Sequence, residues 1–164
     1  MDSLDTKTYS EITHAIRVSA TPFFIEEESS PEKSHYLWAY QIRIENLSPH
    51  EVHLKRRHWE ILDAHGYKQL IEGEGIIGQQ PTLKPGDALE YTSSAPLSTP
   101  SGVMHGYYVM VNNTGEEMKS QSLPFLLIVL TKQESLIDIR YCKILEILID
   151  LYTQKNLKHK MILF

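Results

Sequence analysis

"YLWAYQIRIEN", residues 36–46, is the stretch of sequence that most clearly sets the fold class. Every second position in it is apolar: Tyr36, Trp38, Tyr40, Ile42 and Ile44. The positions between them include Gln41, Arg43 and Glu45. Alternation with a period of two is typical of a β-strand that has one face in a core and the other in water. The segment therefore predicts a half-buried strand rather than a helix.

The next segment, "EVHLKRRHWEILD" (residues 51–63), shows the same alternation with one interruption. Its apolar residues are even-numbered at first, at Val52 and Leu54, and odd-numbered later, at Trp59 and Ile61. An inserted bulge residue shifts the pattern by one position in this way. We therefore expect one strand with a β-bulge near residues 56–57.

Further short segments continue the β pattern. Asp63 and Gly66 in "DAHGYK" offer a hairpin turn before a returning strand, "YKQLI". Other predicted strands lie in "HAIRVSA" (14–20), in "TLKPGDALEYTS" (82–93) around a Pro-Gly turn, in "HGYYVMVNN" (105–113) and in "LPFLLIVLT" (123–131). Seven or eight short strands separated by turns predict an all-β, antiparallel β-sandwich.

The pattern changes near Lys132. Apolar residues recur at steps of three and four through "ESLIDIRYCKILEILIDLYTQKNLKHK" (134–160), which predicts an amphipathic helix with too many charges to span a membrane. We expect three parts: a flexible N-terminus (1–11), a sandwich domain (12–131) and a helical C-terminal extension (132–164). The extension is either an interaction helix or a translated extension of the reading frame without a function.

Composition excludes several functional classes. The chain has 164 residues and a formal net charge of -5, with its charges scattered, so nucleic acid is a poor fit as a partner. Its single cysteine, Cys142, excludes an internal disulfide and a zinc site of several thiolates. The polar first residues are unlike an export signal, and we therefore expect a cytoplasmic protein.

"GEGIIG", residues 73–78, matches the spacing G-x-G-x-x-G of dinucleotide-binding proteins. That motif must open a helix, whereas Pro81 and Pro85 follow here and would break one. The preferred interpretation is a kinked strand connection in which the glycines permit positive φ angles. The alternative is a loop whose backbone amides bind phosphate, pyrophosphate or a nucleotide, in a ligand-binding or hydrolytic protein. The residues of this alternative site are Gly73, Gly75, Gly78 and Arg57.

No catalytic group or metal site stands out. The serines lack a G-x-S-x-G context, and Cys142 lies in the predicted helix among apolar neighbours. The histidine pairs His50/His53 and His53/His58 have odd spacings, which place their members on opposite faces of a regular strand. A bulge could bring the second pair to one face, but no cysteine or matching set of carboxylates completes a metal site. We therefore expect a protein without enzymatic activity or a cofactor, and the sequence leaves any bound metal unknown.

Five segments occur in an order and spacing that resemble the ApaG family, over roughly residues 12–130. They are "ENLS" (45–48), "VHLKRRHWEILDAHG" (52–66), "GEGIIGQQPTLKPGDALEYTS" (73–93), "PLSTPSGVMHGYY" (96–108) and "PFLLIVL" (124–130). The resemblance implies a fibronectin type III-like, or immunoglobulin-like, sandwich. It also implies a small bacterial protein, named for an association with cobalt and magnesium resistance or efflux. Related domains in eukaryotic F-box and polymerase-interacting proteins imply a role in protein binding.

The resemblance carries over to individual positions. Residues at the family's motif positions are Arg57, Trp59, Asp63, Gly66, Gly73, Gly75, Gly78, Gln80, Pro81, Pro85, Gly86, Tyr91, Ser93, Leu97, Thr99, Gly102, Met104, Gly106 and Tyr107. Leu89 replaces a usual aromatic residue and Ser94 a common glycine, so a loop at "EYTSSAP" is expected to differ in shape. The candidate partner contacts are Trp59, Tyr91 and Tyr107. A homodimer paired through sheet edges is also compatible with the fold.

Overall fold

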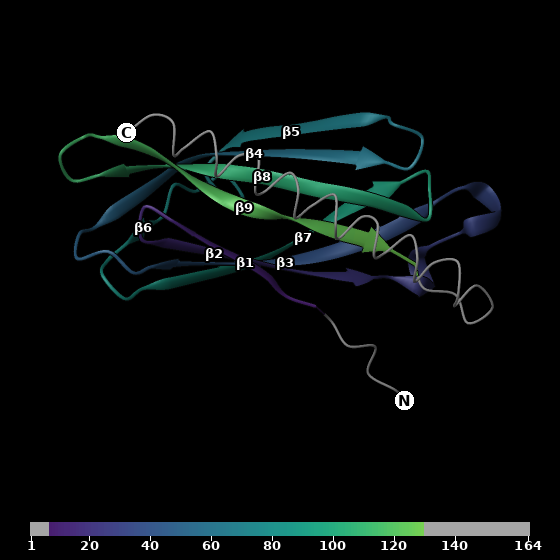
Figure 1. Ribbon diagram of the computed structural model, residues 1–164, viewed down its shortest axis with the longest axis horizontal. Coiled ribbons are helices and arrows are strands. Elements are labelled where there is room, and N and C mark those ends of the chain that lie inside the picture. Colours follow the sequence, from purple (N-terminus) through teal and green to yellow (C-terminus); the bar gives the residue numbers. More distant parts are fainter. Residues whose placement is uncertain (1–6, 130–164) are drawn as a thin grey trace, which may run out of the picture. The chain divides into compact units, whose positions relative to one another are not determined.

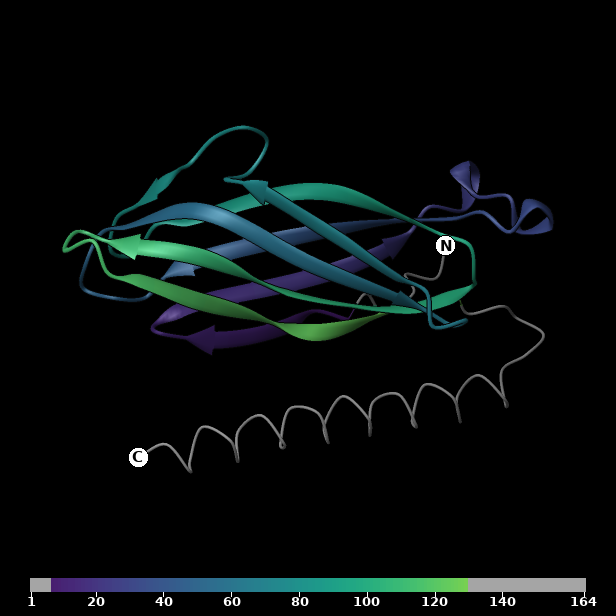
Figure 2. The same ribbon diagram turned by 90° about the horizontal axis from the view of Figure 1, so that it is seen from above.

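The computed structural model describes residues 7–129 (Figure 1). The predicted helical extension, 132–164, lies outside the described residues, as does Cys142. The described part contains strands β1 to β9 and two short 3-10 helices, η1 (Glu26–Glu28) and η2 (Pro31–Lys33). The segment with the two helices projects beyond the strands at one end (Figure 2).

The strands form two antiparallel sheets. The first sheet has the order β1 (Tyr9–Thr13), β2 (Ile16–Phe24), β3 (Tyr36–Asn46) and β7 (Ala88–Leu97). The second has the order β5 (Lys68–Glu74), β4 (Val52–Asp63), β8 (Ser101–Asn112) and β9 (Glu117–Ile128), and β6 (Thr82–Leu83) also pairs with β4. The predicted all-β, antiparallel sandwich is thereby confirmed.

Two expectations about segment boundaries need revision. β1 begins at Tyr9, inside the segment expected to be a flexible N-terminus, because residues 9–13 pair with residues 16–20 of β2. The turn between them holds His14 and Ala15 at positive φ, which suits a tight two-residue hairpin. The "EYTSSAP" segment is not a loop, since residues 90–96 lie within β7 and pair with β3 throughout.

The core lies between the sheets and follows the predicted alternation. In β3, the buried residues are Trp38, Tyr40, Ile42 and Ile44. In β4, the expected bulge is present as a register shift between Leu54 and Arg56. This shift turns Trp59 and Ile61 inward, where both are 1% exposed. Burying large apolar side chains in this way supplies the main favourable free energy of folding.

Gly106 on β8 lets the Trp59 ring of β4 lie against the β8 backbone. Gly106 pairs with Trp59 across the two strands. A Cβ at Gly106 would lie 2.1 Å from the His58 carbonyl oxygen and 2.6 Å from the Trp59 ring. Those distances are shorter than any normal contact, so only glycine fits there.

The two long sides of the sandwich differ. On one side β1 packs against β9, and the Gln121 amide donates to Thr13 Oγ1 at 3.4 Å across the sheets. On this closed side, the Tyr9 and Phe125 rings also approach to 6.1 Å. The other side is formed by β5 and β7, which end their sheets. We call it the open side, and the candidate site lies there.

Candidate functional site

The glycine motif forms a tight turn at the end of β5. The Ile76 amide donates to the Gln79 carbonyl at 2.7 Å, and the Gln79 amide donates back at 3.0 Å. Between them, Ile77 and Gly78 have φ angles of 50° and 74°, as a two-residue hairpin turn requires. Strand β6, not a helix, follows the turn. The preferred interpretation of the motif as a strand connection therefore fits the structure.

The backbone conformation and the close packing at Gly75 require glycine at this position. Its φ is 58°, and a Cβ there would lie 1.8 Å from the Gln79 carbonyl oxygen. Its amide donates to the Lys55 carbonyl at 2.8 Å. The amides of Gly75, Ile76 and Gln79 are thus already used within the protein, which reduces what the loop offers to a phosphate.

Arg57 holds this loop in place. Its guanidinium lies over Gly73, where a Cβ would be 3.0 Å from Arg57 Cζ. Arg57 Nη1 donates to the Gly75 carbonyl at 2.7 Å. The structure therefore brings Arg57, Gly73 and Gly75 together, whereas Gly78 sits apart in the turn. The carbonyls of Glu74 and Gly75 accept the hydrogen bonds of Arg57.

Three tyrosines, two of them buried and one half-buried, lie near Arg57. The Tyr91 and Tyr108 hydroxyls share a short hydrogen bond, and Tyr40 lies close by on β3. Burial raises the pKa of Tyr91 to about 12, although its hydrogen bond to Tyr108 lowers it. Burial also raises the pKa values of Tyr108 and Tyr40, against the lowering effect of the Arg57 charge. These phenols are therefore neutral at neutral pH and are poor general bases there.

The three predicted partner contacts do not form one surface. Trp59 is 1% exposed and belongs to the core. Tyr91 is half-buried and bonded to Tyr108. Tyr107 lies on the outer face of β8, where it stacks on His58 at 4.7 Å and carries Lys119 Nζ 4.4 Å from its ring centre. Because side chains alternate along a strand, Trp59 and Tyr107 face opposite sides of the second sheet.

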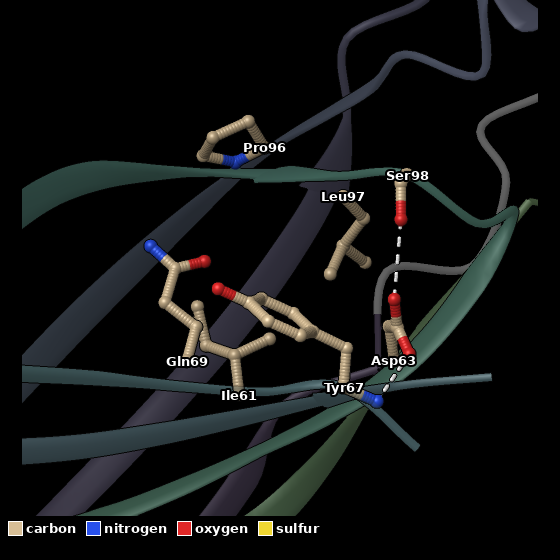
Figure 3. A pocket seen from close by; sticks show the side chains of 7 residues that line it. All are labelled: Ile61, Asp63, Tyr67, Gln69, Pro96, Leu97 and Ser98. Atoms are coloured by element: carbon tan, nitrogen blue, oxygen red, sulfur yellow. Dashed lines mark hydrogen bonds between the residues drawn. The ribbon is translucent and has the colours of Figure 1, made fainter. Parts of the chain in front are cut away.

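A pocket of about 140 Å³ opens between the β4–β5 hairpin and the end of β7 (Figure 3). Its apolar lining comes from Ile61, Pro96 and Leu97, and the Tyr67 ring lies across it. Gln69 lies beside the Tyr67 hydroxyl in the same view. The sequence alone does not reveal this pocket, because its residues come from segments about 30 positions apart that only the fold brings together.

Asp63 fixes the hairpin beside this pocket. Its carboxylate accepts hydrogen bonds from the Tyr67 amide at 2.8 Å and the His65 amide at 2.9 Å, and from the Ser98 hydroxyl at 3.1 Å. Burial raises the pKa of Asp63, but these hydrogen bonds outweigh it, and the net pKa is lowered. The carboxylate is thus a structural acceptor, and the predicted turn role of Asp63 and Gly66 is confirmed.

Exposed apolar side chains gather on the same hairpin. Leu62, Tyr67 and Leu70 are 43%, 69% and 54% exposed, and they lie on or between β4 and β5. Leu62 and Leu70 are diagonal neighbours, since Leu62 pairs with Lys68 and Leu70 with Glu60. We call Leu62, Tyr67 and Leu70 the hairpin surface. Tyr67 lies across the pocket, whereas Leu62 and Leu70 alternate with the pocket-lining Ile61 and Gln69 and therefore lie on the outer face of the second sheet. A single exposed leucine is ordinary, but several exposed apolar side chains on one hairpin are typical of a binding site.

His58 and Lys68 of the second sheet lie against carboxylates. His58 Nδ1 lies 2.8 Å from Glu72 and His58 Nε2 lies 3.4 Å from Glu60. Glu60 also binds Lys68 Nζ at 2.8 Å. Within residues 7–129, no three His, Cys, Asp or Glu side chains are placed to hold a metal ion.

The ApaG domain model matches residues 26–112, more than half of the chain. The chain belongs to the ApaG family. Protein ApaG of Rhodospirillum centenum is 49% identical over 108 residues, which are 66% of this chain and 83% of that protein. Protein ApaG of Paramagnetospirillum magneticum is 50% identical over 107 residues, 65% of this chain and 82% of that protein.

A similar solved structure supports the fold. The crystal structure of the putative ApaA protein from Bordetella pertussis is similar with a TM-score of 0.68 at 40% identity. The match covers 70% of this chain and 93% of that one. Among the described residues of this ApaG domain, no helix has the length and apolar character to cross a membrane.

Proposed function

We propose that this chain is a non-enzymatic ApaG-type binding module that acts through a protein partner. The observation that carries the proposal is the hairpin surface, in which Tyr67 lies across the pocket of Figure 3 while Leu62 and Leu70 are exposed on the outer face of the same hairpin. The pocket at Tyr67 can hold an anchor residue of another protein, and the exposed leucines can extend the contact. The neutral tyrosines and the fully hydrogen-bonded Asp63 favour a structural role for the polar groups around it.

The proposal includes the finer points that the family resemblance suggests. We place the protein in the cytoplasm and assign it a fibronectin type III-like topology. Its link to cobalt and magnesium resistance or efflux rests on the family's name. In this proposal the effect on metal ions is exerted through the bound partner.

A second candidate is binding of phosphate or pyrophosphate by the glycine loop. It is favoured by the charge of Arg57, which makes no ion pair with a carboxylate among residues 7–129. Titration with inorganic pyrophosphate and with ATP, followed by amide NMR shifts, tests it. Shifts confined to residues 73–80 that disappear in Arg57→Lys would favour this candidate, and unchanged spectra at millimolar ligand would remove it.

Affinity capture from the source cell tests the main proposal. The bait is the full chain, compared with a Tyr67→Ser/Leu70→Ser variant and with Ile77→Ser. Ile77 is a matched control, because it is 79% exposed but lies in the glycine turn. We expect wild type and Ile77→Ser to retain the same protein, and the hairpin variant to lose it. Equal retention by all three baits would refute the role of the hairpin surface.

A further inference from the structure

β7 is a long edge strand whose outer side pairs with no other described strand. It pairs with β3 along its whole length. Its middle, residues 92–94 ("TSS"), is exposed and uncharged. Proteins usually block such an edge with charges, a bulge or a covering element, because the unused backbone groups can pair with another chain.

The register shows which backbone groups of β7 face outward. At the start of the pair, the Asn46 amide donates to the Asp87 carbonyl at 2.9 Å. In an antiparallel ladder, hydrogen-bonded residues alternate with residues that face away from the partner strand. The residues bonded to β3 are then Leu89, Tyr91, Ser93 and Ala95. The residues that face outward are Ala88, Glu90, Thr92, Ser94 and Pro96.

Pro96 supports this assignment independently. A proline has no amide hydrogen, so within a strand it is tolerated where its nitrogen faces an edge. Pro96 belongs to the outward set, as this rule demands. It also ends the outer row of donors. The outward amide donors run from Ala88 to Ser94, and Thr92 is the central residue of the outward set from Ala88 to Pro96.

We propose that β7 pairs antiparallel with β7 of a second copy of this chain, about a two-fold axis at Thr92. Thr92 then lies opposite Thr92 of the partner subunit, and Glu90 lies opposite Ser94 of the partner subunit. Each facing pair exchanges both of its backbone hydrogen bonds. The first sheets of the two copies become one continuous sheet, and the pairing closes as a dimer because each β7 edge is used once.

The distribution of charged residues on the two edge strands favours pairing of a second copy at β7 rather than at β5. Glu90 is the only charged residue of β7 and is paired with Arg43. In the two-fold register it faces a serine rather than a second glutamate, which avoids the repulsion of like charges placed opposite each other. Facing threonines are a favourable cross-strand pair. The outward residues of β5 include Lys68, Glu72 and Glu74, so the β5 edge is protected by charges.

A charge placed at the axis tests the dimer. Thr92→Lys puts two ammonium groups opposite each other, whereas Gln41→Lys adds the same charge at an exposed position paired with Thr92 on β3. For full-length protein at about 100 μM, we expect sedimentation to give twice the 18.9 kDa chain mass for wild type and for Gln41→Lys. Thr92→Lys should sediment as a monomer. A monomeric wild type, or a dimeric Thr92→Lys, would overturn the proposal. No partner protein is needed, so this result is independent of the proposed function.

Amide hydrogen exchange locates the interface. Thr92 and Ser94 amides should exchange slowly in the dimer and speed up on dilution. Tyr91 and Ser93 amides, bonded to β3, should be slow at both concentrations. A dimer in which the Thr92 and Ser94 amides exchange rapidly would have its interface elsewhere and would equally overturn the proposal.

Discussion

The closed and open sides of the sandwich differ in what their side chains do. On the closed side, Thr13 and Tyr9 contact β9 and join the two sheets. On the open side, β5 and β7 pair with no further strand on their outer edges among residues 7–129, a pocket lies between them, and apolar side chains reach solvent. Side chains that join the sheets stabilise the fold, whereas side chains left at a free edge are available for binding. We therefore attribute the stability of the fold to the core and the closed side, and the proposed partner binding to the open side.

The largest loss of stability is expected at the core that both sides share. Trp59→Ala leaves a cavity against Gly106 and should lower the free energy of unfolding by about 3–5 kcal/mol. Trp59→Phe should cost less, since it keeps a ring at that place. Urea denaturation of both variants measures the effect. A Trp59→Ala variant as stable as wild type would show that the core does not depend on this ring.

A smaller loss is expected where the open side needs structural support. Arg57→Ala removes the donor to the buried Gly75 carbonyl and should cost about 1–3 kcal/mol. Arg57→Lys cannot reproduce the planar guanidinium over Gly73 and should restore only part of the stability. Urea midpoints of the two variants provide the measurement. If Arg57→Ala unfolds at the wild-type midpoint, the glycine loop does not rely on Arg57.

A pH-dependent effect is expected at Asp63. Its lowered pKa means that the folded state favours the carboxylate, so its contribution is present above the pKa of an unfolded aspartate, about 3.9. That contribution is lost as pH falls further through the folded pKa. Asp63→Asn should therefore be less stable than wild type at neutral pH, and the gap should narrow below about pH 4. Thermal unfolding of both proteins between about pH 7 and about pH 2 checks this. A difference in stability that stays constant with pH would contradict it.

The smallest effect on stability is expected at the hairpin surface. Tyr67 and Leu70 are more than half exposed, so Tyr67→Ser/Leu70→Ser should change the free energy of unfolding by no more than about 0.5 kcal/mol. The melting temperature should stay close to that of wild type. A large decrease would show that these side chains support the fold and would weaken their assignment to binding.

Local patterns in the sequence were enough for the strands, the bulge and the turn at Asp63. Each of these features is determined by a pattern among a few neighbouring residues, as in the alternation of residues 36–46. β1 was missed because only five residues form it, and Ile12, its strongest apolar residue, faces solvent. The pocket could not be predicted, since it requires Ile61 and Leu97 to meet across two sheets. The predicted contacts Trp59 and Tyr107 failed to share a surface because the sequence alone does not relate the faces of β4 and β8.

Photo-cross-linking in the source cell compares the two sides most directly. A benzoylphenylalanine is placed at Tyr67 on the open side or at Ile12 on the closed side, which are 69% and 55% exposed. We predict that the probe at Tyr67 yields a discrete cross-linked protein and that the probe at Ile12 yields none. A cross-linked protein obtained only from Ile12, or the same one from both positions, would contradict the assignment of binding to the open side.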